Sequence, residues 1–312
     1  MARSFPEWLA PTSLEEALEL RTRYGDDATI VAGGTFIGIL MSQNIMVPQV
    51  LMTLRYVREL AFIEDQRNDG SAQGTPLHGR QDNTLRIGAM TTHREVERSA
   101  VVQQGLPILA HTFALVASPR VRNQATVGGV LADADYASDP PAMLNALNAR
   151  AVARSLGGER EIPIEELITG YYETSLRPDE LLTEVRIPRN VEQAVYRKFR
   201  SRSSEDRPCV AVAAARIDGK LRVVVGAVAE RPQYFPDICN VVSPPQGDGC
   251  GMSSPPETER PYDEQLNREV ATEIGRRYAE AIQPISDSRG SAEYRRRVIA
   301  VEVRRALEEM MP

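Results

Sequence analysis

Two glycine-containing loops limit what this chain can fold into more than any other feature of its sequence. The first, Val31-Ala32-Gly33-Gly34-Thr35-Phe36-Ile37-Gly38, follows the apolar run 28–31, which reads as a strand, and precedes the apolar residues 39–41, which could open a helix. Glycine lets backbone N–H groups close on a phosphate, and a helix N-terminus adds partial positive charge. The loop is therefore either an anion site or a tight strand-to-helix turn without a ligand, and short glycine motifs often match by chance.

Composition excludes several classes of protein. At 312 residues the chain is long enough for two or three domains. Its formal net charge of −6 and its pI near 5.4 argue against nucleic-acid binding, which usually needs a basic face. No apolar stretch is long enough to span a membrane, and the first residues lack the apolar region of a secretory signal. We therefore expect a cytoplasmic globular protein without a membrane span or a nucleic-acid partner.

The residues that could bind metal or act as nucleophiles are scattered. The cysteines form no C-x-x-C pair, and the histidines are also far apart, so we predict each histidine at or near the surface: Cys209, Cys239, Cys250, His78, His93 and His111. A self-contained iron–sulfur cluster or structural zinc site needs about four ligands and is excluded. We predict no metal ligand and no catalytic residue in this chain, so redox chemistry would need an organic cofactor.

Hydrophobic periodicity divides the chain into three units. The first contains a helix that begins with a Thr12–Glu15 capping box and then strands at 28–31 and 49–54. The second unit begins near Leu60, and residues 65–83 in it read as a surface loop. Its other predicted elements are strands at 61–64, 85–89 and 181–188, a buried helix at 106–116, a short helix at 140–147 and a hairpin with arms at 151–154 and 161–163.

The third unit begins near Val191. Strands are predicted at 194–199, 210–217 and 221–229, and Asp218-Gly219 between the last two is a two-residue hairpin signal. The segment 233–262 is rich in Pro, Gly and Ser and reads as a long exposed loop. Two helices, roughly 263–282 and 290–310, close the chain.

The second glycine loop adds to a set of motifs in a fixed order. It reads Thr126-Val127-Gly128-Gly129 and is followed by Ser138-Asp139. The other members are Ala32-Gly33-Gly34-Thr35, then G-E-R-E-I-P at 158–163, D-E-L-L-T-E-V-R-I-P at 179–188 and S-D-S-R-G-S-A-E-Y-R-R at 286–296. Each motif alone is weak, but five in this order and at these spacings are a specific signal.

With these motifs the chain resembles, over nearly its whole length, the FAD-binding medium subunits of the molybdenum hydroxylases, which include xanthine dehydrogenase and aerobic carbon monoxide dehydrogenase. The resemblance implies an α+β protein. Residues 1–190 would form a FAD-binding domain of the p-cresol methylhydroxylase type, with subdomains of about 1–56 and 57–190. Residues 191–312 would form the smaller α+β C-terminal domain of the carbon monoxide dehydrogenase flavoprotein type, an antiparallel sheet plus helices.

The resemblance also implies the cofactor contacts. The loops 31–38 and 126–130 would hold the FAD pyrophosphate from two sides, so that Val130 joins Thr126, Val127, Gly128 and Gly129. Asp139 would accept hydroxyl hydrogen bonds near the ribityl or phosphate region. Val116 and Leu181 would line the cofactor, and Lys198 would lie near the isoalloxazine, where an ammonium stabilises the anionic reduced flavin.

Each of these side chains also has a purely structural interpretation. Asp139 could cap the helix that follows it, and Lys198 could lie on a strand face in water. Leu181 and Val116 could be core residues of a strand and a helix. Three residues depart from the family pattern: Phe36 stands where a polar residue is frequent, Val130 where Asn is common, and Tyr136 where Pro is frequent.

The function implied by the resemblance is electron transfer. A molybdopterin-binding large subunit and a [2Fe–2S] small subunit would complete a heterotrimer, alone or dimerised, and FAD would pass electrons to an external acceptor such as NAD, a quinone or oxygen. One alternative is a stand-alone flavin-dependent oxidoreductase acting on a small molecule. The other is a degenerate flavin-fold scaffold, which the departures at Phe36 and Val130 motivate.

Overall fold

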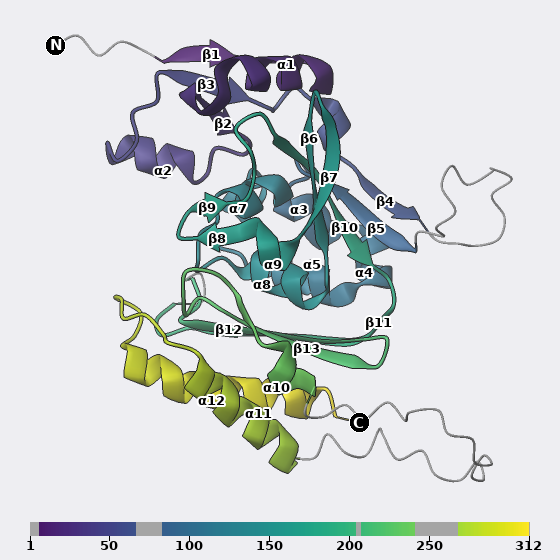
Figure 1. Ribbon diagram of the computed structural model, residues 1–312, viewed down its shortest axis with the longest axis vertical. Coiled ribbons are helices and arrows are strands. Elements are labelled where there is room, and N and C mark those ends of the chain that lie inside the picture. The colour runs from purple at the N-terminus through teal and green to yellow at the C-terminus, as the bar shows by residue number, and fades with distance from the viewer. Residues whose placement is uncertain (1–5, 67–82, 204–206, 241–267, 312) are drawn as a thin grey trace, which may run out of the picture.

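The computed structural model describes residues 6–66, 83–203, 207–240 and 268–311, which stack in layers (Figure 1). A small sheet lies at the N-terminal end, a five-stranded sheet with helices follows, and a four-stranded sheet backed by two helices closes the stack. This α+β architecture confirms the predicted fold class. None of the helices in these ranges is long and apolar enough to cross a membrane.

The N-terminal unit is a parallel sheet. Its strand order is β1 (Glu7–Leu9), β3 (Val50–Thr53), β2 (Ala28–Val31), and α1 (Leu14–Tyr24) buries Ala17 and Leu18 against it. The cap of α1 lies one residue later than predicted, because the Ser13 side chain accepts from the N–H of Glu16 while the Glu16 carboxylate accepts from that of Thr12. The short helix α2 (Ile37–Ser42) extends from the far end of β2.

The central sheet is antiparallel. Its order is β4 (Ile63–Gln66), β5 (Thr84–Gly88), β10 (Leu181–Pro188), β6 (Arg150–Ser155), β7 (Gly158–Pro163). A separate two-stranded sheet joins β8 (Ile168–Gly170) to β9 (Glu173–Thr174). The helices of this unit are α3 (His93–Arg98), α4 (Ala100–Gly105), α5 (Pro107–Ala114), α6 (Pro119–Arg122), α7 (Val127–Ala132), α8 (Asp139–Ala146) and α9 (Ile164–Leu167).

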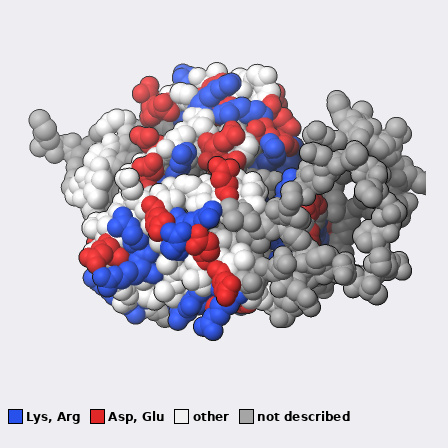
Figure 2. All heavy atoms as spheres, turned by 60° about the horizontal axis from the view of Figure 1, so that its bottom comes forward, with Lys and Arg blue, Asp and Glu red and all other residues white. Residues whose placement is uncertain are grey.

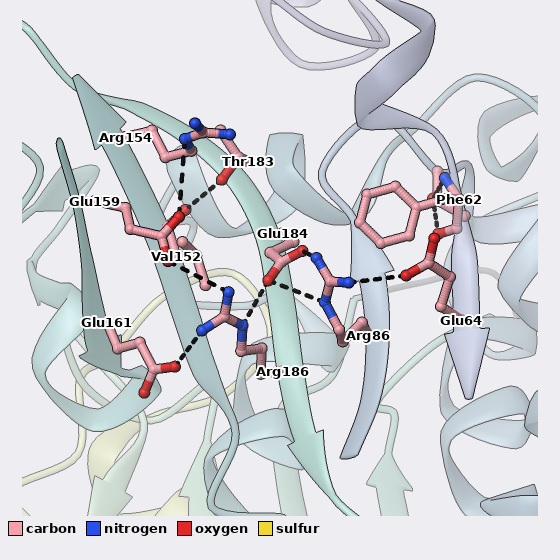
Figure 3. A network of polar contacts seen from close by, with 11 residues as sticks. Phe62, Glu64, Arg86, Val152, Arg154, Glu159, Glu161, Thr183, Glu184 and Arg186 are labelled. Carbon is pink, nitrogen blue, oxygen red and sulfur yellow. Dashed lines mark hydrogen bonds and ion pairs between the residues drawn. The ribbon is translucent and has the colours of Figure 1, made fainter. Parts of the chain in front are cut away.

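The two faces of the central sheet differ in polarity because successive side chains alternate. In β10, Val185 and Ile187 enter the core, whereas Glu184 and Arg186 point to the other face. That second face carries a charge ladder across neighbouring strands (Figure 3), in which Glu184 accepts from Arg86 and Arg186, and Arg186 also donates to Glu161 at 2.5 Å. The opposite charges neutralise one another and leave the apolar face to pack on the helices.

The C-terminal unit is a sheet covered on both faces. Its order is β11 (Val191–Phe199), β12 (Val210–Ile217), β13 (Lys220–Gly226), β14 (Gln233–Tyr234). The small residues Ala211, Ala213 and Ala215 of β12 belong to the core shared with α8, while Val210, Val212 and Ala214 pack toward α11 (Arg268–Ala281) and α12 (Ala292–Glu309). Viewed from this helical end, positive and negative side chains are interspersed (Figure 2).

Most predicted strands and helices are confirmed, and the Asp218-Gly219 turn has the two positive φ angles, +49° and +70°, that this hairpin type requires. The predicted exposed loop 233–262 is wrong at its start. Gln233–Tyr234 pairs with β13, and α10 (Pro236–Asn240) buries Cys239. Residues 241–262, and residues 67–82 of the predicted 65–83 loop, lie outside the described residues.

Candidate functional site

The two glycine loops, far apart in sequence, lie directly against each other. A Cβ built on Gly33 would be 1.9 Å from the carbonyl oxygen of Gln124, just before the second loop. A Cβ built on Gly129 would be 3.5 Å from the Cβ of Ala32. The loops thus approach so closely that Gly33 cannot carry a side chain without moving one of them.

The first loop offers free backbone donors. Within the described chain, the N–H groups of Gly33, Gly34, Thr35 and Phe36 donate no hydrogen bond. Gly34 has a φ of +71°, a conformation that glycine adopts at little cost. Successive N–H groups without partners form a concave donor surface of the kind that binds anions.

Four N–H groups of the second loop, those from Val127 to Val130, already have partners within the folded chain. Val127 and Gly128 donate to the carbonyls of Thr91 and Ala89, at 3.0 and 2.7 Å, and Gly129 donates to the Thr126 hydroxyl at 3.0 Å. Val130 donates to the Thr126 carbonyl, and its side chain packs at the edge of the central core. This loop is therefore a close-packed wall, and the apolar Val130 in place of a frequent Asn is explained by that packing.

A buried polar cluster joins α8 and the end of α5 to β11. The Lys198 Nζ lies 2.8 Å from Asp139 Oδ2 and 2.9 Å from the carbonyl of Leu115, and its side chain is 2% exposed. The Tyr196 hydroxyl donates to Asp139 Oδ1 at 2.7 Å. Lys198 is therefore not a strand-face lysine in water. Asp139 does not cap α8 either, since Ser138 occupies the N-cap position.

Burial shapes the electrostatics of the same region. Burial raises the pKa of Asp139, although the Lys198 ammonium and the Tyr196 hydroxyl oppose that shift. Burial also raises the pKa of Asp133, at the end of α7, to about 7, and the neighbouring Asp135 carboxylate adds to the effect against Arg207. A carboxyl that titrates near neutral pH thus stands at the end of the helix that the second loop begins.

The remaining predicted residues occupy different surroundings. Val116 is half-buried in the turn after α5, so it is not a helix-core residue. Leu181 begins β10, and its side chain is buried in the core of the N-terminal unit with Leu18 and Met52. The structure therefore brings the two loops together, and separately Asp139 with Lys198, while Leu181 serves the core beside β2 and β3.

Phe36 has an aromatic partner that accounts for its presence. Its ring stacks on Tyr172, with centroids 5.6 Å apart and planes 13° from parallel. Tyr172 lies between β8 and β9 with a φ of +58°, and its N–H donates to the Ala134 carbonyl. The stack therefore connects the first loop to the segment that follows the second loop.

Three residues that contribute contacts in or beside the candidate site were not predicted from the sequence. Tyr196 lies two residues before Lys198, so strand alternation could have placed both on one face. His93 is buried, contrary to the prediction for the histidines, and its Nε2 lies 3.2 Å from the carbonyl of Thr126. Tyr136 donates to Asp287 at 2.9 Å across the domain boundary, a contact that no local pattern shows.

These residues fit the FAD that the resemblance implies. A diphosphate needs several N–H donors and little side-chain bulk, and the first loop offers four donors beside Gly129. No charged residue lies in either loop to oppose an anion. The donor set and the bare backbone thus suit a dinucleotide phosphate.

Comparison with known proteins gives two family matches that together span both ends of the chain. Residues 3–190 match the FAD binding domain in molybdopterin dehydrogenase, and residues 259–310 match the CO dehydrogenase flavoprotein C-terminal domain. The first match covers more than half of the chain.

Individual relatives are similar to this chain over nearly their full lengths. The chain is 30% identical to the 6-hydroxypseudooxynicotine dehydrogenase complex subunit alpha of Paenarthrobacter nicotinovorans, over 98% of this chain and 94% of that protein. It is 31% identical to the nicotine 6-hydroxylase medium subunit of the same organism, over 97% and 96%. A carbon monoxide dehydrogenase structure from Hydrogenophaga pseudoflava superposes with a TM-score of 0.79 at 27% identity, over 99% and 98% of the two chains. With its paired glycine loops, this chain therefore belongs to the FAD-binding family of the molybdopterin dehydrogenases.

Proposed function

We propose that this protein holds FAD between its two glycine loops and works as the electron-transfer subunit of a molybdenum hydroxylase. The observation that carries the proposal is the row of unpartnered N–H groups at Gly33, Gly34, Thr35 and Phe36, set against the second loop. FAD supplies the capacity to accept electrons singly and to donate them in pairs. The chain's own residues bind the cofactor and set its surroundings.

The two loops have different tasks in this proposal. The first loop, 31–38, donates its free N–H groups to the pyrophosphate. In the second loop, 126–130, the N–H groups from Val127 to Val130 already donate to the carbonyls of Thr91, Ala89 and Thr126 and to the Thr126 hydroxyl. This loop therefore serves as a rigid wall without side-chain bulk at Gly129. The second loop therefore limits how closely the first loop can approach it.

The Asp139–Lys198 pair provides the charged surroundings of the flavin. Two acceptors hold the Lys198 ammonium, so its position is fixed before any cofactor arrives. A fixed positive charge stabilises negative charge that develops nearby on reduction. Val116 and Leu181 complete the proposed lining, Leu181 through its backbone because its side chain lies in the core.

The partners are proposed from the names of similar proteins, which describe them as subunits. Similar chains are named as a subunit of a dehydrogenase complex and as the medium subunit of a nicotine hydroxylase. We propose that a molybdopterin-binding large subunit and a [2Fe–2S] small subunit assemble with this chain. We also place it in the cytoplasm, where thiols stay reduced, because Cys209 and Cys239 are both free and buried.

The proposal is tested by measuring the FAD, iron and molybdenum content of the purified complex and the reduction potential of its flavin. The full-length tagged chain, co-expressed with its molybdopterin and iron–sulfur subunits, should carry one FAD per chain and copurify with iron and molybdenum. Lys198→Gln should lower the flavin reduction potential, whereas Lys220→Gln, at an exposed position in the hairpin, should leave it unchanged. A chain that takes up no FAD on reconstitution would contradict the proposal.

A further inference from the structure

A buried arginine holds the turn between α5 and α6. Arg122 is the last residue of α6, and its side chain is 9% exposed. Its Nη1 donates to the carbonyls of Val116 and Ala117, at 2.9 and 3.0 Å. Backbone carbonyls inside a protein need hydrogen-bond partners, and here one guanidinium serves two of them. The turn is thus tied to the end of the helix that follows it.

The same turn is strained, so it needs such a restraint. Ala117 has a φ of +41°, in the left-handed region that residues with a Cβ rarely adopt. A backbone conformation of this kind persists only where the surrounding contacts hold it. The bond from Arg122 to the Ala117 carbonyl is one of those contacts.

Glu97 sets the direction of the arginine. The Nε of Arg122 donates to Glu97 Oε2 at 3.0 Å, and Nη1 of Arg94 donates to Glu97 Oε1 at 2.7 Å. Each carboxylate oxygen therefore accepts from a different arginine. Because the guanidinium is a rigid planar fork, fixing Nε of Arg122 also fixes the direction in which its Nη1 points.

The turn held in this way reaches Lys198. Leu115 directly precedes Val116, and the carbonyl of Leu115 accepts from the Lys198 Nζ at 2.9 Å. Asp139 accepts from the same ammonium at 2.8 Å. Contacts therefore run from Arg122 through three consecutive backbone residues, 115–117, to the buried lysine of the C-terminal domain.

We propose that Arg122 is a positioning residue that fixes the turn 115–117 and, through the Leu115 carbonyl, the Lys198 ammonium. Position matters because a charge stabilises developing negative charge best when it is already in place. An ammonium that moves stabilises the reduced flavin less. The effect on the flavin rests on the proposed function, whereas the link between Arg122 and Lys198 does not.

The test keeps the charge of Arg122 and removes its fork. Arg122→Lys retains a positive charge, but an ammonium cannot reproduce the planar set of donors. Arg189→Lys is the matched control, because the Arg189 side chain is 6% exposed and pairs with Asp65. Arg189 precedes β11, and roughly 20 Å of extended strand separates Val191, the first residue of β11, from Lys198.

The first measurement needs no cofactor. Urea unfolding of the full-length apoprotein is compared for Arg122→Lys, Lys198→Gln and the double variant. We expect these effects to be non-additive by a factor of about three or more in the unfolding equilibrium constant, whereas Arg189→Lys should combine with Lys198→Gln additively within about twofold. Glu97→Gln weakens the hold on Arg122 and should couple to Lys198→Gln in the same way, which keeps the inference testable if Arg122→Lys does not fold.

The second measurement is the reduction potential of the flavin in the complete complex. Arg122→Lys should lower the potential in a chain that has Lys198, because the ammonium is then less firmly held. It should leave the potential unchanged in a chain that carries Lys198→Gln. Arg189→Lys should leave the potential unchanged in both.

Three results would overturn the inference. Arg122→Lys and Lys198→Gln could have additive effects on unfolding. Arg122→Lys could leave the flavin potential unchanged while Lys198→Gln lowers it. Arg122→Lys could lower the potential equally with and without Lys198, which would mean that Arg122 acts on the flavin by another route. If Lys198→Gln itself does not lower the potential, the role of Lys198 in the proposed function fails, and the cofactor-free unfolding measurement keeps that failure distinct.

Discussion

His93 shows how burial sets the protonation state of a single residue beside the second glycine loop. Burial lowers the pKa of His93 to about 4, and the nearby Arg122 acts in the same direction against the hydrogen bond to Thr126. The neutral ring therefore donates from Nε2 to the Thr126 carbonyl and packs edge-on against Phe113, with centroids 4.9 Å apart.

This pKa shift predicts a pH dependence of stability. Above pH 6.5 the imidazole is neutral in both the folded and the unfolded chain, so its contribution to folding is complete. Between pH 6.5 and 4 only the unfolded chain takes up the proton, so stability falls as pH falls, by about 3 kcal/mol in total. Urea unfolding of the apoprotein across this range should show a smaller slope in His93→Gln than in the exposed control His111→Gln. Equal slopes would refute this role of His93.

Phe36 is a second residue whose contribution can be isolated. Its stack on Tyr172 is the contact that ties the first loop to the β8–β9 turn, and aromatic pairs of this kind contribute about 1 kcal/mol beyond their buried area. Phe36→Leu should therefore weaken FAD binding about fivefold, measured by fluorescence titration, with a small change in stability. Tyr172→Phe keeps the stacked ring and should bind FAD as the unsubstituted chain does. Unchanged affinity in Phe36→Leu would mean that the stack does not hold the loop.

At the scale of elements, the close approach of the two loops depends on one missing side chain. A methyl group at Gly33 would overlap the Gln124 carbonyl and force the loops apart, which costs about 1–3 kcal/mol in a well-packed region. Gly33→Ala should therefore lower both the free energy of unfolding and the affinity for FAD. Gly38→Ala is the comparison for stability, since a Cβ there meets no described atom within 4 Å, and it should unfold no earlier than the unsubstituted chain. Similar destabilisation in both variants would contradict this account.

The strands and helices were largely predictable from sequence because periodicity and turn residues are local signals. The glycine motifs also identified both loops. They could not show which loop has free donors, because Val127 and Gly128 bond to Thr91 and Ala89, partners that only the folded chain supplies. The Asp139–Lys198 pair joins α8 to β11 across 59 residues, a separation beyond any local pattern.

At the scale of the whole molecule, a polar cluster of Tyr136, Asp287, Arg289 and Arg295, called the latch here, connects the C-terminal domain to the cofactor-binding half. Asp287 accepts from Tyr136 at 2.9 Å, from Arg289 at 2.9 Å and from the fully buried Arg295 at 2.7 Å. Tyr136 lies between the second loop and Asp139, so the latch reaches the candidate site. The tyrosine in place of a frequent proline is explained by this bond.

The latch predicts the effect of removing one charge. Asp287→Asn leaves the buried Arg295 without an anionic partner and should destabilise the chain by about 2–3 kcal/mol. Burial raises the pKa of Asp287, but the hydrogen bonds from Arg295, the Arg289 backbone and Tyr136 outweigh it and hold the pKa below its ordinary value. A carboxyl of this kind stabilises the fold above its unfolded pKa of 3.8 and loses that effect as pH falls further. The variant's deficit, measured by urea unfolding, should therefore be full at pH 7 and shrink below pH 3.8.

The control for the latch is an exposed ion pair on α12. Glu293→Gln removes the partner of Arg297, both highly exposed, and should change stability by less than about 0.5 kcal/mol. If Asp287→Asn is no more destabilised than Glu293→Gln, the latch does not hold the domains together.

The central claim is that the flavin of this chain receives its electrons from the iron–sulfur subunit and not from an organic substrate. One anaerobic mixing experiment tests this claim most directly. Oxidised, FAD-loaded chain is mixed in a stopped-flow cell with the reduced [2Fe–2S] subunit, and the visible absorbance of the flavin is followed. The account predicts that the flavin bleaches as the iron–sulfur subunit is oxidised, and that a small organic substrate without that subunit leaves the flavin unchanged. A flavin that ignores the reduced iron–sulfur subunit, or that bleaches with the organic substrate alone, would contradict it.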